Sequence, residues 1–450
     1  MSKLVCVPLK GQLGDVILQD HMKIFCYDEF NPQDTAMMQA LYSRSAESVE
    51  KHVEKVKATG SGKFMEQFYV GYGHASIADC GSTTIFIEGV SMFVTKAVQN
   101  WQLYSGQETS SRYIDMSKQP IVDPVGTKDS KNILDKWMKF YTENQEEVQK
   151  HIMQKYPRKE GEDEKVYEKA VKARAFDTLR GFLPAGVTTQ FSWHTNLRQA
   201  HDNLALLKYH PLAEVRKVAE GIEAELKAKY PQSFCHVETP EQKKYREFLM
   251  TKYNYYFNKT AKPYSFKTSI NKKEISSYKD IFKNRAPRIG LPNFLAELGN
   301  LTFEFLLDFG SFRDVQRHRN GICRMPLLTT KFGFNEWYLN ELPEGVKKVA
   351  IKLIKEQTTA INKLKTTPEI KQYYCAMGFD VSCKVTYGLP ASLYVAELRS
   401  GRLVHPTLRK IAHKMSQSIM KAFPDIKIQS DFSLDDWNIR RGMQDISAKK

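Results

Sequence analysis

Apolar residues recur every three or four positions in three stretches of the chain. The stretches run from Val49 to Val56, from Ile133 to Phe140 and from Leu212 to Leu226, and the last begins directly after Pro211. This spacing places apolar side chains on one face of a helix, and proline is well tolerated in a first helical turn. The pattern therefore predicts three amphipathic helices.

One segment has the pattern of a strand. Residues 82–90, STTIFIEGV, are rich in β-branched side chains, are too few for an ordinary helix, and end near Glu-Gly. Helices arranged around a few strands indicate an α+β fold, with a small antiparallel sheet and flanking helices.

The sequence also contains an internal repeat. Val98-Gln99 recurs in the second half as Val315-Gln316, and HPLAEVRKVA at 210–219 recurs as HPTLRKIA at 405–412. Two shorter pairs lie between them: GFLP at 181–184 with YGLP at 387–390, and Asn196-Leu197-Arg198 with Glu397-Leu398-Arg399. The order is the same in both halves, which predicts a tandem duplication of the α+β domain. We expect domains at 1–236 and 291–450, with a basic, aromatic-rich connector and the start of the second domain at 237–290.

The composition limits which classes of protein the sequence can belong to. A chain of 450 residues that is 42% apolar can bury two ordinary cores. Its seven cysteines are widely spaced without a C-x-x-C pair, which argues against a disulfide framework or a zinc ribbon. No P-loop, G-x-G-x-x-G or metal-ligand spacing occurs, so no metal site is predicted. The start of the chain resembles no signal peptide and no stretch approaches a membrane span, so we expect a cytoplasmic protein without membrane contact.

The net charge of +16 comes entirely from the second half. Residues 241–450 hold 37 basic and 20 acidic residues, whereas residues 1–240 hold 30 and 31. In the connector, basic residues alternate with aromatic ones, a composition that could bind single-stranded nucleic acid. We prefer a second interpretation, in which the aromatic side chains pack on the domain cores and the lysines stay solvated.

Two polar passages are complementary. The first holds two serines, a carboxylate and an arginine, namely Ser105, Glu108, Ser110 and Arg112. The second, at 315–332, holds Arg317, His318 and Arg319 where the first has Asn100, Trp101 and Gln102. Hydroxyls and guanidinium groups hold phosphates through charge-assisted hydrogen bonds, so both passages are candidates for binding anions.

The order of these motifs resembles the flavin-dependent thymidylate synthase family, ThyX. The resemblance rests on GHASIADCGSTTIFIEGVSMF (73–93), SGQETSSRY (105–113) and RGFLPAGVTTQFSWHTNLR (180–198). The family signature is an Arg-His-Arg triplet followed by S-x-x-E-x-S-x-R, with Arg-x-x-Leu-Pro and Asn-x-Arg downstream. Here the first copy keeps all but the triplet, and the second copy keeps the triplet alone.

The resemblance implies an enzyme that methylates dUMP with methylenetetrahydrofolate and NADPH through FAD. The implied substrate-binding residues are Ser105, Glu108, Ser110, Arg112, Arg180 and Arg402, of which Ser110, Arg112 and Arg180 are the catalytic candidates. Arg402 is a looser match to a further nucleotide-contacting arginine of the family, which falls near Leu207-Lys208 in the first copy. The implied cofactor-binding residues are His74, Asn196, Arg198, Arg317, His318 and Arg319.

The family's enzymes are homotetramers with sites between subunits. The resemblance therefore implies a homodimer that forms a pseudo-tetramer, and we expect the two passages to meet across two chains. Two alternatives remain: flavin-dependent modification of another pyrimidine, and a non-catalytic nucleic-acid-binding protein on a decayed scaffold. Cys323, close to the triplet, could be a nucleophile of the kind that classical thymidylate synthases use, although a small buried cysteine is the commoner case.

Overall fold

The chain divides into two compact units in its computed structural model. Unit 1 comprises Met1–Thr84, His194–Leu204 and Gly221–Glu238, and unit 2 comprises Ile85–Trp193, Ala205–Glu220 and Thr239–Lys450. The structure describes residues 5–6, 25–26, 30–43, 45, 47–61, 76–112, 114–235, 237–434 and 436–438. Unit 2 takes residues from both halves of the sequence, so the predicted domain boundaries, which follow a sequence repeat, stay a prediction.

Unit 1 contains a small helical core. Helices α1 (Pro32–Tyr42) and α2 (Val49–Thr59) pack through Met37 and Met38 against Val53 and Val56. The predicted helix at Val49 is thereby confirmed. The unit also contains α4 (Ser76–Asp79), η3 (Pro231–Phe234) and the antiparallel pair β1 (Val5–Cys6) and β2 (Phe25–Cys26).

Strands β3 (Ser82–Ser91) and β4 (Thr188–Asn196) form a two-stranded sheet and run from one unit into the other. The strand predicted at 82–90 is therefore confirmed. Helix α5 (Met92–Gln99) follows β3, and α9 (Leu197–Leu207) and α10 (Ala213–Lys229) follow β4. Helix α10 confirms the helix predicted after Pro211.

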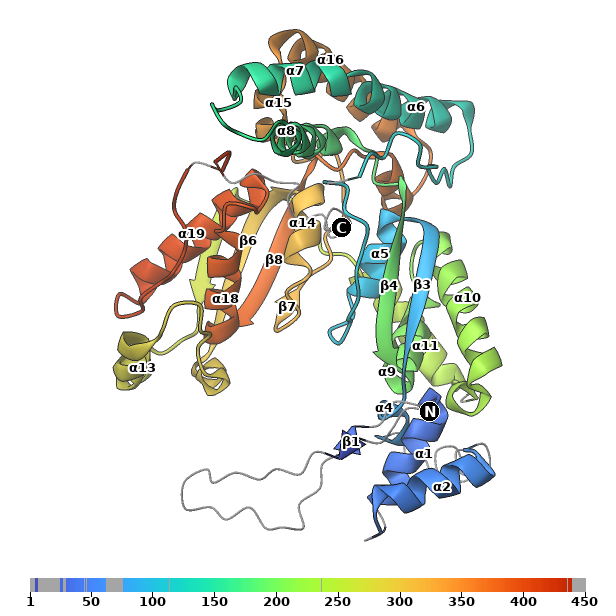
Figure 1. Cartoon of the computed structure of the whole chain (residues 1–450). Helices are drawn as coiled ribbons and strands as arrows, with labels where there is room; N and C mark the ends of the chain where they lie inside the picture. Colours follow the sequence, from blue (N-terminus) through green and yellow to red (C-terminus); the bar gives the residue numbers. More distant parts are fainter. Residues whose placement is uncertain are drawn as a thin grey trace. The chain divides into compact units, whose positions relative to one another are not determined.

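Unit 2 is built on an antiparallel sheet of four strands. Its order is β5 (Tyr264–Thr268), β6 (Asn300–Asp308), β8 (Asp380–Gly388) and β7 (Ile322–Cys323). Alternate residues of β6 are buried, which is the period-2 pattern of a strand with one face in the core. Helix α14 (Phe309–Val315) follows β6, and α18 (Leu389–Arg399) and α19 (Pro406–Ala422) pack against β8 and β6 (Figure 1). Mixed helices and small antiparallel sheets agree with the predicted α+β class.

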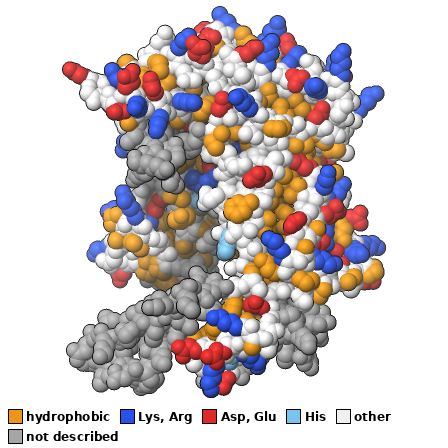
Figure 2. Space-filling model, turned by 45° about the vertical axis from the view of Figure 1, so that its right-hand side comes forward, with side chains coloured by type: hydrophobic (Ala, Val, Ile, Leu, Met, Phe, Trp, Pro, Cys, Tyr) orange, Lys and Arg blue, Asp and Glu red, His pale blue; other side chains and the backbone are white. Residues whose placement is uncertain are grey.

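A group of helices covers the upper end of unit 2 in Figure 1. They are α6 (Lys128–Glu143), α7 (Gln145–Lys155), α8 (Glu164–Leu179), η2 (Arg180–Phe182), α15 (Glu336–Asn340), α16 (Glu344–Lys363), α17 (Pro368–Lys371) and η6 (Gln372–Tyr374). Helix α6 confirms the helix predicted at 133–140, because Ile133, Trp137 and Phe140 are all buried. Figure 2 shows Lys, Arg, Asp and Glu side chains interspersed over the upper part of its view.

The connector differs from expectation. Helix α11 (Pro240–Tyr253) begins with a Thr239 capping box but has no buried residue. Tyr245, Phe248 and Tyr253 are 62%, 47% and 51% exposed, so the expectation that the aromatic side chains of the connector pack on a core is wrong for this helix. It is borne out further along, where Phe257 contacts Phe332 and Phe266 contacts buried Phe303. The rest of the segment contains α12 (Lys272–Ile275), η4 (Ser276–Tyr278), α13 (Lys279–Asn284) and η5 (Asn293–Leu298).

The structure bears on the pairings of the predicted repeat, while the tandem duplication itself stays a prediction. The two His-Pro pairs precede corresponding helices, α10 and α19, as expected. GFLP, however, spans η2 before β4, whereas YGLP spans the end of β8 and the start of α18, so this pairing is wrong. Asn196 to Arg198 lie at the start of α9 and Glu397 to Arg399 at the end of α18, so that pairing is wrong too. Helices η2 and η6, which begin at Arg180 and Gln372, each precede a long strand, β4 and β8.

Within the described part of the chain, no helix combines the length and apolar character needed to cross a bilayer. Among the same residues, no three His, Cys, Asp or Glu side chains gather as a metal site.

Candidate functional site

The two polar passages meet within one chain. The Nε of Arg319 donates a hydrogen bond to the backbone oxygen of Gln99 (3.1 Å), and its guanidinium lies 4.7 Å from the ring centroid of Tyr104. Gln316 Nε2 also donates to the backbone oxygen of Lys96 (3.0 Å). The two passages are thus in contact within the chain, and the expectation of a site shared between two chains stays a prediction.

Glu108 is the centre of a buried ion cluster. Its carboxylate accepts hydrogen bonds from Lys96 Nζ of α5 (2.8 Å), Gln99 Nε2 (3.3 Å) and the guanidinium of Arg313 in α14. Burial alone would raise the pKa of Glu108, but the charges of Arg313 and Lys96 outweigh it and lower the pKa to about 2. The structure thus places Glu108 among cations that join the two halves.

Arg112 and the two serines lie near this cluster. The guanidinium of Arg112 makes two hydrogen bonds to Asp177 (2.6 and 3.0 Å) and a third to the backbone oxygen of Leu403 (3.2 Å). Ser110 Oγ accepts the backbone N–H of Arg112 (3.3 Å), and Ser105 is exposed. Arg112 belongs to the passage that is predicted to bind phosphate, and it therefore connects this passage to the second half of the chain.

Arg180 is buried, with 2% of its surface exposed. It donates a hydrogen bond to Ser311 Oγ (3.0 Å), which also lies 3.2 Å from His405 Nδ1. Burial and the neighbouring Arg180 lower the pKa of His405 well below its usual value, so the imidazole is neutral. Within the described residues the Nε of Arg180 has no hydrogen-bond partner.

The carboxylate of Asp314 is under the influence of arginines from both halves of the chain. Arg317 Nε lies 3.5 Å from its carboxylate, and Arg399 donates to its backbone oxygen (2.9 Å). Burial alone would raise its pKa, but the charges of Arg317, Arg399, Arg112 and Arg180, in that order, lower it well below its usual range. This residue was missed in the sequence, although it stands three positions before the triplet.

The triplet lines a cavity of about 500 Å³. Its polar lining includes Arg317, His318, Arg319 and Arg399, and its apolar lining includes Leu291, Pro390, Ala391, Tyr394, Val395 and Leu398. The volume lies within the range of about 300–1,000 Å³ typical of small-molecule sites. The cavity can thus hold a ligand that is apolar over most of its surface and anionic along one edge.

His318 is a hydrogen-bond acceptor in this cavity. Its Nε2 accepts the Nε–H of Arg399 (2.7 Å), and burial together with the charge of Arg399 lowers the pKa of His318 to about 3. The neutral imidazole therefore fixes the direction of the Arg399 side chain.

Arg399, and not Arg402, is the arginine near the end of α18 that lines the cavity. Leu207 is the last residue of α9, and Arg399 is the last residue of α18. Arg402 is paired instead with Asp431 (2.9 Å) and is not in the cavity lining. The interpretation of Arg402 as a substrate residue stays a prediction to which this cavity gives no support, because the arginine that lines the cavity is Arg399, three positions earlier.

The remaining predicted residues belong to unit 1 or lie outside the described residues. Asn196 Oδ1 accepts the backbone N–H of Gln199 (2.8 Å), and Arg198 is paired with Asp79 (2.6 Å). Neither Asn196 nor Arg198 lines the cavity in unit 2. His74 lies outside the described residues.

Cys323 is unsuited to nucleophilic attack. Although the residue is partly exposed, burial of its thiol raises the pKa to about 12, so little thiolate exists at neutral pH. A cysteine mechanism is therefore disfavoured at this position.

The comparisons with known proteins agree with the resemblance. UPF0159 proteins of Thermoplasma acidophilum, Chlamydia muridarum and Chlamydia pneumoniae are each 23% identical to the chain, over 87%, 81% and 80% of its length and 94%, 79% and 78% of theirs. Their similarity thus extends through both halves. Residues 26–232 match the model of a family described as thymidylate synthase complementing protein, and this part of the chain is therefore similar to that family.

Proposed function

We propose that this chain is a flavin-dependent thymidylate synthase, which methylates dUMP with methylenetetrahydrofolate and NADPH through FAD. The observation that carries the proposal is the contact of Asp314 with Arg317 (3.5 Å) and Arg399 (2.9 Å) of the second half, beside which Arg112 of the first half donates to the backbone oxygen of Leu403 (3.2 Å). The charges of Arg112 and Arg180 also lower the pKa of Asp314. The cavity of the triplet adjoins this cluster, because Arg317 and Arg399 belong to both.

The charge of the cluster suits a nucleotide phosphate. Arg112 is paired with Asp177 and Arg317 lies 3.5 Å from Asp314, whereas within the described residues Arg180 and Arg399 have no carboxylate within 4 Å and are available to an anion. A phosphate monoester is close to a dianion at neutral pH, and each charge-assisted hydrogen bond contributes about 1.5–3 kcal/mol. The cluster is therefore matched to a monophosphate such as dUMP.

The cavity fits a flavin ring by its chemistry. Tyr394 and Leu398, both exposed, offer apolar surface to a planar ring. Arg317 and Arg319 offer positive charge to the ring when it becomes anionic on reduction. Bound FAD would accept electrons from NADPH and carry the one-carbon unit. The chain's own residues would hold the ring and the phosphate side by side, with His318 keeping Arg399 in place.

The repeated order of elements supports a tandem duplication. Strand, helix, 3-10 helix, strand and two helices occur as β3, α5, η2, β4, α9, α10 and again as β6, α14, η6, β8, α18, α19. Backbone hydrogen bonds between the copies come in reciprocal pairs: Ala185 N to Cys375 O with Met377 N to Leu183 O, and Gly186 N to Tyr373 O with Gly378 N to Gly181 O. These pairs are what a pseudo-twofold axis within the chain would produce. A homodimer of such chains, a pseudo-tetramer, is part of the proposal.

A second candidate function is favoured by α11. Its exposed Tyr245, Phe248 and Tyr253 could stack on bases, and Lys252 lies 5.5 and 5.6 Å from the last two rings. A protein that binds single-stranded nucleic acid is therefore the alternative.

Growth of a thymidine-requiring host separates these functions. We expect the parent gene to restore growth and purified protein to be yellow and bleach with NADPH. Arg399→Ala should weaken dUMP binding about 10–150-fold and abolish growth, whereas Arg402→Ala, the matched control, should leave both unchanged. Yellow protein that never supports growth would favour another pyrimidine. Colourless protein that binds oligonucleotides would refute the enzyme.

A further inference from the structure

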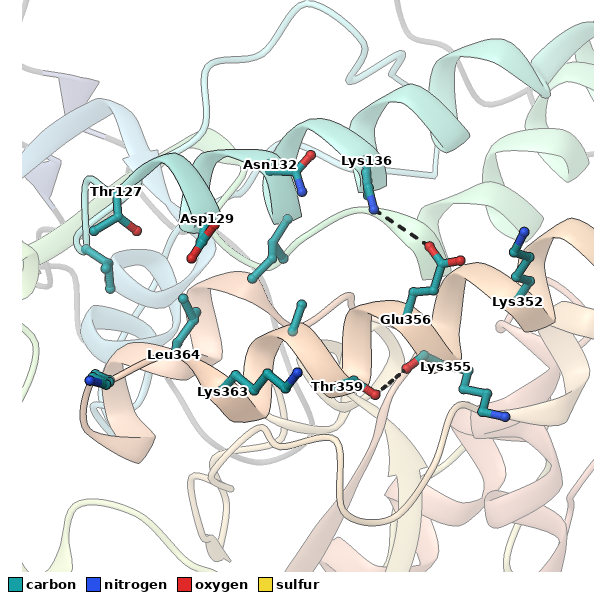
Figure 3. Close-up of a pocket in the computed structure, with 14 residues that line it drawn as sticks. Thr127, Asp129, Asn132, Lys136, Lys352, Lys355, Glu356, Thr359, Lys363 and Leu364 are labelled. Atoms are coloured by element: carbon teal, nitrogen blue, oxygen red, sulfur yellow. Dashed lines mark hydrogen bonds and ion pairs between the residues drawn. The ribbon is translucent and has the colours of Figure 1, made fainter.

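A second concave site lies between α6 and α16. The groove has a volume of about 1,040 Å³ and shares no residue with the triplet cavity. Figure 3 shows the two helices side by side, with Lys136 of α6 and Glu356 of α16 pointing toward one another. Their charged groups are 3.7 Å apart.

The groove is a fixed feature of the fold. Buried Gln357 of α16 donates a hydrogen bond to the backbone oxygen of Ile133 in α6 (2.6 Å), which holds the two helices together. Buried Ile133 and Leu364 form an apolar part of the lining. A ligand would therefore meet a preformed surface.

One wall of the groove is strongly basic. Lys352, Lys355, Lys363 and Lys365 all line it, and within the described residues none of them makes an ion pair. At a rise of about 1.5 Å per residue, the first three form a row roughly 17 Å long on α16. The acidic lining residues are Glu356, already paired with Lys136, and Asp129.

Helix stabilisation explains only part of this row. Cations in the last turn of a helix interact favourably with its dipole, which accounts for Lys363 and Lys365. Lys352 and Lys355 lie two or more turns upstream of the end of α16, beyond the reach of that effect. Their presence at the groove therefore favours an external anion.

We propose that this groove binds an acidic peptide segment of a partner protein, which lies along α16. The lysine row supplies complementary charge, and the partly exposed Val125 and Ala360 of the lining supply apolar surface for the segment's other side. Among the described residues that line the groove none is aromatic, which favours a peptide over bases that would need to stack. The proposal is independent of the enzyme function.

The test uses a fluorescein-labelled, helix-forming 16-residue peptide and the full chain. The peptide carries four glutamates separated by three, four and four positions, leucines on the adjoining face and alanine elsewhere. A matched peptide has glutamine in place of glutamate. Fluorescence anisotropy should show saturable binding of the acidic peptide and at least 10-fold weaker binding of the glutamine peptide.

Two double variants with equal charge change locate the site. Lys355→Glu with Lys363→Glu should weaken binding of the acidic peptide at least 10-fold. Lys347→Glu with Lys348→Glu, on the same helix but outside the groove lining, should change it less than twofold. Circular dichroism checks that both variants fold.

Three outcomes would overturn the proposal. The first is no saturable binding of the acidic peptide to the parent chain. The second is equal weakening by both double variants, which would mean that the peptide responds only to net charge. The third is that the groove variant loses binding of a labelled 20-residue oligodeoxythymidine but not of the peptide, which would assign the groove to nucleic acid.

Discussion

Replacing Glu108 by glutamine should destabilise the fold rather than act first on substrate binding. The carboxylate is 2% exposed and accepts hydrogen bonds from Lys96, Gln99 and Arg313. Glutamine keeps the size of the side chain but removes its charge, which leaves two buried cations without their anion. Breaking a buried ion pair in this way costs about 3–5 kcal/mol.

The cost of this substitution should depend on pH through Lys96. Burial lowers the pKa of Lys96 to about 8, and the attraction of Glu108 keeps it from falling further. The folded chain therefore holds this proton less tightly than the unfolded chain, so stability rises with pH from about 8 toward the unfolded pKa near 10.4. Without Glu108 the folded pKa falls and this rise starts at lower pH. The variant should thus be destabilised more at pH 6 than at pH 9.

Urea unfolding followed by circular dichroism at pH 6, 7.5 and 9 measures this effect. Glu146→Gln is the matched control, because Glu146 is paired with Lys150 on the surface and its loss should leave the midpoint unchanged. Unchanged stability of Glu108→Gln at every pH, together with weaker dUMP binding, would refute the buried cluster and return Glu108 to the substrate.

Further outcomes follow from the same structure. The proposed function predicts one FAD per chain by absorbance against protein concentration, and a ratio near two would contradict a single composite site. At pH 7.5, Cys323 should resist iodoacetamide because burial raises its pKa to about 12, while exposed Cys235 should be alkylated, as mass spectrometry can show. In urea unfolding, Gly181→Ala should lower the free energy of unfolding by about 1–3 kcal/mol, because its Cβ would lie 2.6 Å from Tyr338, whereas Gly221→Ala in α10 has open space and should stabilise by about 1 kcal/mol.

Local patterns predicted the elements whose period is regular. The strand at 82–90 and the helices at 49, 133 and 212 follow from residue spacing because burial on one face imposes that spacing. Lys96 shows the limit of this reasoning. In the helix MFVTKAVQ it has the pattern of an ordinary polar residue, yet it is fully buried, because its partner Glu108 is held in turn by Arg313 of a helix in the second half of the chain.

Candidate site residues were predictable in kind but less well in position. The split between a serine-arginine passage and an Arg-His-Arg triplet was visible in the sequence, and the structure brings the two passages together. Asp314 and Arg399 were missed because their roles depend on how α14 and α18 pack, which no motif records. The two short matches, GFLP with YGLP and Asn-Leu-Arg with Glu-Leu-Arg, failed because each shares only two or three residues and these lie in different elements of the fold.

The asymmetry between the two halves explains why one composite site per chain is the expected number. Under the proposed duplication, Lys96 and Arg313 are equivalent, since each stands two positions before the valine of its Val-Gln pair. Both cations contact the single carboxylate of Glu108. When the two passages are aligned on these pairs, Met325 takes the place of Glu108, and its sulfur lies 3.7 Å from Gln316 Nε2 in a buried setting. A carboxylate at position 325 would add negative charge where both buried cations, Lys96 and Arg313, are already bound to Glu108. The reciprocal site could therefore not be rebuilt without replacing these residues too.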